Sequence, residues 1–78
     1  MRPLHDIAFD ILNDDALKGN TRVYSEAYLK PMLMLSTTQD MYYLDSGDSI
    51  VRYALANLTH YRGEKAKALK AELKAHLV

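Results

Sequence analysis

Apolar residues recur at spacings of three and four along most of the chain, which is the pattern of helices that bury one face. The first stripe follows Pro3, whose missing amide hydrogen suits the first turn of a helix. It ends at the polar run 13–15, and residues 18–21 have the composition of a loop. The members of this stripe are Leu4, Ile7, Ala8, Ile11 and Leu12.

A second helix is predicted from about Ser25, a candidate N-cap, to Leu35. Pro31 conflicts with these bounds, because a proline beyond the first turn removes a backbone hydrogen bond and kinks the helix. A helix that begins nearer Tyr28 would instead place Pro31 in its first turn, and the sequence leaves both alternatives open. The apolar face of this helix comprises Tyr28, Leu29, Met32, Leu33 and, at its end, Leu35.

Residues 36–40 have cap and turn composition, and we expect one short helical turn through Met41 and Tyr42. Asp45 or Ser46 can cap a third helix, and Asp48 favours the positive end of its dipole. The longest uninterrupted apolar stripe lies in this helix, and its members are expected to be the most buried residues. They are Ile50, Val51, Ala54, Leu55 and Leu58.

The break before the last helix is predicted within residues 57–63. Either Thr59 caps a helix that begins at His60, or Gly63 ends the third helix. The last helix runs from Glu64 to about Leu77, and its narrow apolar face comprises Ala66, Leu69, Leu73 and either His76 or Leu77. Short helices must bury their stripes on one another, so the sequence predicts an all-α, compact bundle of about four short helices, with residues 1–78 as a single helical domain.

Composition and charge narrow the classes of function. The chain has 78 residues, no cysteine, and ten basic against ten acidic side chains. Disulfides and thiolate metal sites are therefore excluded, and a strongly basic nucleic-acid module is disfavoured. The chain lacks the run of about 18 apolar residues that a membrane span needs, and its N-terminal residues do not resemble a secretory signal. We expect a cytoplasmic protein with no membrane partner.

Patterns for catalysis and metal binding are weak. The histidines at 5, 60 and 76 form no pair at a spacing of four, so no metal site is expected. The acidic pairs 14/15 and 45/48 lie at helix ends, and capping explains the second pair. The serines lie at helix boundaries, and the glycines are isolated. We therefore predict that the protein is not an enzyme and uses no cofactor.

The charges are divided unevenly along the chain. Residues 1–48 carry eight acidic and four basic side chains, whereas residues 49–78 carry six basic and two acidic ones. A basic last helix can meet nucleic acid or an acidic partner, but lysines near a helix C-terminus are also typical of a solvated face, which we favour. The candidate basic contacts are Arg62, Lys65, Lys67, Lys70 and Lys74.

Tyrosines are the strongest functional signal. The chain has six tyrosines, one phenylalanine and no tryptophan. A core of this size cannot hold all six, and exposed tyrosine offers a partner a large contact area at a low entropy cost. The candidate contacts are Tyr42, Tyr43, Tyr53 and Tyr61.

Four stretches of the chain carry a resemblance, namely residues 42–51 (YYLDSGDSIV), 54–57 (ALAN), 61–64 (YRGE) and 70–74 (KAELK). They are similar to a group of short uncharacterised proteins encoded by bacteriophages, prophages and related mobile elements. The resemblance covers most of residues 28–74, but Tyr43 stands where that pattern has Gly and Tyr61 where it has Trp. Its motifs are helix caps and core positions, so it implies a fold and, for a phage protein, the host cytoplasm, but no activity.

We therefore predict a small helical interaction module that binds and modulates a larger host or phage protein. One alternative is a nucleic-acid-binding accessory protein that uses the basic C-terminal helix. Another is a homo-oligomer whose tyrosine-rich face is the interface between copies.

Overall fold

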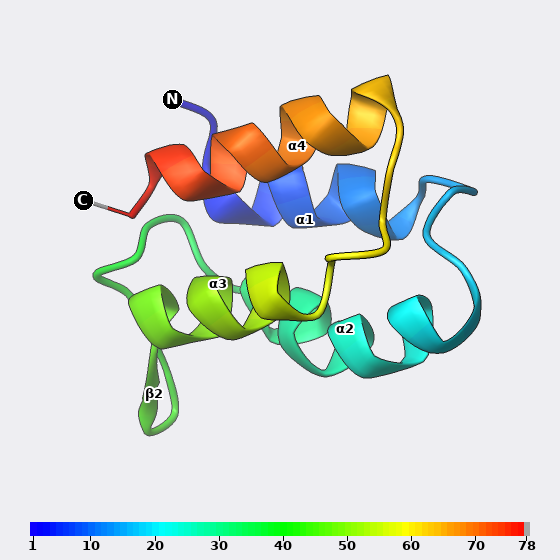
Figure 1. Cartoon of the computed structure of the whole chain (residues 1–78). Coiled ribbons are helices and arrows are strands. Elements are labelled where there is room, and N and C mark those ends of the chain that lie inside the picture. Colours follow the sequence, from blue (N-terminus) through cyan, green and yellow to red (C-terminus); the bar gives the residue numbers. More distant parts are fainter. Residues whose placement is uncertain (78) are drawn as a thin grey trace.

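The computed structural model describes residues 1–77, which form four α-helices and one short antiparallel hairpin (Figure 1). The prediction of a mostly helical protein is confirmed, whereas the all-α class is corrected by the hairpin. The elements are α1 (Leu4–Leu12), α2 (Gly19–Met32), β1 (Met41–Tyr42), β2 (Asp45–Ser46), α3 (Gly47–Ala56) and α4 (Glu64–Ala75).

The helices enclose one apolar core. α1 contacts α2 and α4, and α3 contacts the same two helices, so each helix has two neighbours. In Figure 1, α4 lies along α1 on one side of the molecule and α3 lies beside α2 on the other. The stripes predicted from the sequence supply most of the core, which contains Leu4, Ile7, Ala8, Ile11, Leu17, Leu29, Met32, Leu35, Ile50, Val51, Ala54, Leu58, Tyr61, Ala66, Leu69 and Leu73.

Leu55 is an exception to the predicted core, because it is only partly buried. It follows Ala54 directly, and consecutive helical residues point about 100° apart, so Leu55 lies on the flank of the stripe. On α4 the buried face continues past Leu73 to His76.

α2 begins at Gly19, six residues before the predicted N-cap Ser25. Ser25 is buried inside the helix, and its hydroxyl donates a hydrogen bond to the Arg22 carbonyl at 3.3 Å. Pro31 stands in the last turn, one residue before the end of α2 at Met32, so it does not start the helix.

Arg22 gives a physical reason for the early start of α2. Its guanidinium donates hydrogen bonds to the carbonyls of Leu12, at 2.6 Å, and Leu17, at 2.8 Å. These bonds fasten the first turns of α2 to the end of α1 and to the link between the two helices. The spacing of apolar residues does not indicate such a tertiary contact, so it could not predict the early start of α2.

The hairpin replaces the helical turn expected at Met41 and Tyr42. Met41 pairs with Ser46 and Tyr42 with Asp45, which leaves a turn of two residues between the strands. Tyr43 in this turn has a φ of +56°, in the left-handed region. Turns of two residues need positive φ and are usually signalled by Asn or Gly, so this turn was missed.

Residues 35–40, here called the junction loop, form backbone hydrogen bonds with the starts of both α1 and α3. The carbonyls of Leu35 and Ser36 accept hydrogen bonds from the first two amides of α1, each at 2.9 Å. The carbonyls of Thr38 and Asp40 accept from the first two amides of α3, at 3.0 and 2.7 Å. The loop thereby satisfies donors that a helix start otherwise leaves without a partner.

Of the four described helices, α3 alone has a side-chain cap at its start. The Ser46 hydroxyl accepts a hydrogen bond from the Ser49 amide at 3.1 Å, so Ser46 rather than Asp45 is the N-cap of α3. The break before α4 lies within residues 57–63 as predicted, but neither detailed alternative is correct. Gly63 precedes α4 as its N-cap residue with a φ of +122°, and no helix begins at His60.

Candidate functional site

A cleft of about 330 Å³ opens where α2, the hairpin and α3 meet. Tyr28 from α2 and Tyr53 from α3 stack with their ring centroids 5.6 Å apart, and Tyr42 from β1 lines the same cleft. We call this the tyrosine cleft. Its lining comprises Ala27, Tyr28, Pro31, Tyr42, Asp45, Ser49, Ile50 and Tyr53.

The hairpin turn next to the tyrosine cleft is apolar and exposed. Tyr43 is 84% exposed and Leu44 is 95% exposed, and we call these two residues the hairpin tip. The rings of Tyr42 and Tyr43 meet edge to face at 4.7 Å between centroids, so the tip and the cleft share an aromatic contact. In Figure 1 the hairpin projects from the body of the protein below α3.

Three of the four tyrosines predicted as contacts are therefore brought together, and Tyr61 is not. Tyr61 is fully buried, and its hydroxyl donates a hydrogen bond to Asp14 Oδ2 at 2.6 Å. Burial and the Asp14 carboxylate raise the pKa of Tyr61, while the same hydrogen bond lowers the pKa of Asp14. Tyr61 therefore belongs to the core, and its buried ring is not a surface contact as the sequence had suggested.

Tyr28 and Pro31 line the cleft but were not predicted as site residues. From the sequence, Tyr28 was predicted on the apolar face of the second helix, and Pro31 was considered only for its effect on the helix backbone. Both positions become part of a site because the hairpin packs near the end of α2. No sequence signal marked that hairpin, so none marked these two residues.

A second depression, which we call the basic groove, runs along α4 and the link before it. It encloses about 450 Å³ and is lined by Arg62, Gly63, Lys67, Lys70, Ala71 and Lys74. Four of the five predicted basic contacts are thus brought together. Lys65 is not, because it precedes Lys67 by two residues and points about 200° away around the helix. Its charge instead helps to lower the pKa of Asp14.

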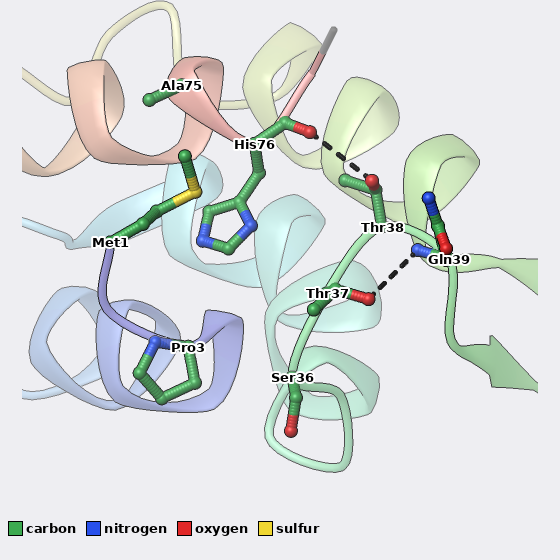
Figure 2. A pocket seen from close by; sticks show the side chains of 8 residues that line it. All are labelled: Met1, Pro3, Ser36, Thr37, Thr38, Gln39, Ala75 and His76. Atoms are coloured by element: carbon green, nitrogen blue, oxygen red, sulfur yellow. Dashed lines mark hydrogen bonds between the residues drawn. The ribbon is translucent and has the colours of Figure 1, made fainter.

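A third pocket, of about 440 Å³, lies between the N-terminal residues, the junction loop and the end of α4 (Figure 2). His76 Nε2 lies 2.7 Å from the Arg2 carbonyl, and the Thr38 hydroxyl donates to the His76 carbonyl at 3.2 Å. The Thr37 hydroxyl accepts from the Gln39 amide at 3.2 Å. Figure 2 shows the Thr38–His76 hydrogen bond, which joins the junction loop to the end of α4, and the Thr37–Gln39 hydrogen bond within the loop. The polar groups of this pocket are therefore engaged in structural contacts.

One member of each candidate acidic pair accepts a hydrogen bond from another side chain of the fold. Asp14 accepts from Tyr61, and Asp48 Oδ1 accepts from Arg52 Nε at 2.6 Å. Within residues 1–77 no three His, Cys, Asp or Glu side chains gather closely enough to hold a metal ion. In the same part of the chain, no helix combines the length and apolar character needed to cross a membrane.

Comparison of the chain with protein-family models, with curated proteins and with solved structures gives no match.

Proposed function

We propose that this protein is a small interaction module that binds a larger protein through the tyrosine cleft and the hairpin tip, and so modulates that protein. The observation that carries the proposal is the combination of a recessed aromatic site and a projecting apolar turn on one surface. Tyr28, Tyr42 and Tyr53 surround the recess, and Tyr43 and Leu44 form the projection.

The residue types support protein recognition. Tyrosine is enriched among the few residues that dominate binding energy at interfaces, and such residues fill or line well-packed pockets. Asp45 and Ser49 add polar groups to the apolar lining, as the mixed lining of a specific site requires. A partner with one apolar side chain for the cleft and an apolar groove for the tip matches this surface.

The backbone at Tyr43 adds an independent argument. A non-glycine residue in the left-handed region costs about 1–3 kcal/mol and persists only where the surrounding structure imposes it. Here that cost accompanies a tyrosine with 84% exposure, which contributes little to the core. Such conflicts between local preference and structure are concentrated at functional sites.

The proposal includes a biological setting taken from the resemblance. A phage- or mobile-element-encoded protein of this kind acts in the host cytoplasm, on a host or phage protein. Small size suits this role, because the module needs only one interaction surface rather than an enclosed active site.

The test is affinity capture from bacterial lysate with four immobilised proteins: the wild type and the Leu44→Ser, Tyr53→Ala and Tyr24→Ala variants. Tyr24 is the matched control, because it is an exposed tyrosine of α2 that does not line the cleft. We expect one protein to be retained by the wild type and Tyr24→Ala and lost by the other two variants. Once it is purified, Tyr53→Ala should weaken its binding by about 2 kcal/mol, roughly 30-fold. Equal retention by all four proteins would refute the proposed surface.

A further inference from the structure

The basic groove has a regular arrangement of positive charge. Lys67, Lys70 and Lys74 are spaced by three and four residues and so share one face of α4. Arg62 extends this row from the link before the helix. Lys67 and Lys74 are seven residues apart, which corresponds to about 10.5 Å along the helix axis.

These charges are not neutralised within the described chain. The groove lining contains no carboxylate, and no ion pair in residues 1–77 involves any of its four cations. Glu72, the nearest acidic residue to Lys74 in sequence, lies on the other flank of α4. There it accepts two hydrogen bonds from Arg2, at 2.9 and 2.8 Å.

Lys70 differs from the other three cations. Its ammonium group donates to the carbonyls of Tyr61, at 2.6 Å, and Leu58, at 3.1 Å, so it anchors the link to α4. Burial, followed by the charges of Lys74 and Arg62, lowers the pKa of Lys70. The cations therefore lie close enough to repel one another, and a bound anion relieves that repulsion. Arg62, Lys67 and Lys74 are exposed and available to such an anion.

The groove floor indicates which kind of anion fits. Gly63 and Ala71 are the uncharged lining residues, so the groove has no large apolar side chain and no pocket for an anchoring side chain of a protein partner. A nucleic-acid backbone needs no such pocket, because it presents repeated charge. Phosphates of one strand of a duplex follow at about 3.4 Å along the axis, so about 10.5 Å of helix spans about three of them.

From these observations we propose that the basic groove binds the phosphate backbone of duplex DNA without sequence preference, as a second site separate from the tyrosine cleft. Figure 1 places α4 on the opposite side of the molecule from the hairpin. Contacts to the backbone alone carry charge but no sequence information. The protein is therefore able to hold DNA on one side and a protein partner on the other.

The test is a titration of a labelled duplex of about 20 base pairs, followed by fluorescence anisotropy between roughly 50 and 200 mM salt. Three exposed cations predict a slope of about −2.7 for log K against log salt, which is an affinity loss of about 40-fold over this range. Arg62→Gln, Lys67→Gln and Lys74→Gln should each weaken binding and bring the slope to about −1.8. Changing the base sequence of the duplex should leave the affinity within about twofold.

Lys65→Gln is the matched control, because it removes the same charge from the same helix on the other flank. It should leave the affinity within about twofold and the slope unchanged. Circular dichroism should show the same helicity for all variants, and Lys67→Ala replaces Lys67→Gln if that variant is unfolded. Tyr53→Ala should bind DNA as the wild type does, so failure of the tyrosine cleft as a protein site is distinguishable from failure of this proposal.

Three outcomes would overturn the proposal. Absence of binding at roughly 50 mM salt excludes the site. An equal loss in Lys65→Gln shows that net charge rather than the groove attracts DNA. Displacement of the duplex by polyglutamate at an equal concentration of charge shows that the groove takes acidic protein segments instead.

Discussion

Gly47 provides the sharpest test of the fold, because a side chain there would meet backbone. A Cβ atom at this position would lie 2.6 Å from the Thr37 carbonyl oxygen and 3.0 Å from Thr38 Cα. The junction loop cannot move away freely, because the Gly47 amide is bonded to the Asp40 carbonyl at 2.7 Å and the Asp48 amide to the Thr38 carbonyl at 3.0 Å. Gly47→Ala must therefore displace the loop from the start of α3.

The cost of Gly47→Ala follows from three contributions. Inserting a methyl group into a closely packed site costs about 1–3 kcal/mol. Weakening the two hydrogen bonds costs about 1 kcal/mol each. The higher helix propensity of alanine returns at most about 1 kcal/mol. The net loss is about 2–4 kcal/mol, which in a domain of this size lowers Tm by about 10 °C or more.

Thermal unfolding followed by circular dichroism measures this loss, and Gly19→Ala is the control. Gly19 has a φ of +62° but nothing within 4 Å of an added Cβ, so its replacement adds backbone strain of about 1–2 kcal/mol without a clash. Amide exchange at Asp48 should be faster in Gly47→Ala alone. A loss no greater than that of Gly19→Ala, with the Asp48 amide protected as in the wild type, would refute the close approach.

Four further outcomes are expected. Ser46→Ala should lower the free energy of unfolding in urea by about 1 kcal/mol because the Ser49 amide loses its acceptor, whereas Asp45→Ala should not. Leu58→Ala should cost about 2–5 kcal/mol and Leu55→Ala clearly less, and equal losses would contradict the placement of Leu55 at the edge of the core. Hydrogen bonds from the Ser36 and Thr37 amides lower the pKa of Asp40, so its contribution to stability is complete above about pH 4 and is lost on further acidification. An acid titration should therefore find Asp40→Asn less stable than the wild type at neutral pH, with a difference that narrows as the pH falls below 4. Tyr43→Asn should keep or raise Tm, because asparagine adopts positive φ more readily, but it should weaken partner binding.

The helices were predictable wherever one face is apolar over several turns. α1, α3 and α4 follow their stripes, and Ser46 was one of the two predicted caps of α3, because both serine and aspartate are strong N-cap residues. α2 was placed six residues late because its first turns are polar and are held by the Arg22 guanidinium. Hydrophobic periodicity indicates which face of one helix is buried, but it does not indicate hydrogen bonds between elements.

The candidate sites were predictable in residue type but not in grouping. Helical spacing alone separates Lys65 from the lysines of the groove, once the bounds of α4 are known. The burial of Tyr61 depends on Asp14, 47 positions earlier, and no local pattern indicates that partner. The tyrosine cleft depends on the hairpin, whose turn consists of Tyr and Leu rather than the usual Asn and Gly.

The hairpin tip and the exposed cations of the basic groove are separate from the parts that stabilise the fold. The junction loop satisfies the first amides of α1 and α3, and every helix supplies side chains to the core. The hairpin tip and the exposed cations of the basic groove contribute neither to the core nor to those backbone contacts. We therefore expect substitutions at Leu44 or Lys67 to change the proposed binding with little change in stability, and substitutions at Gly47 to do the reverse. This separation makes the two proposed sites testable in a domain of only 78 residues, whose stability leaves little room for loss.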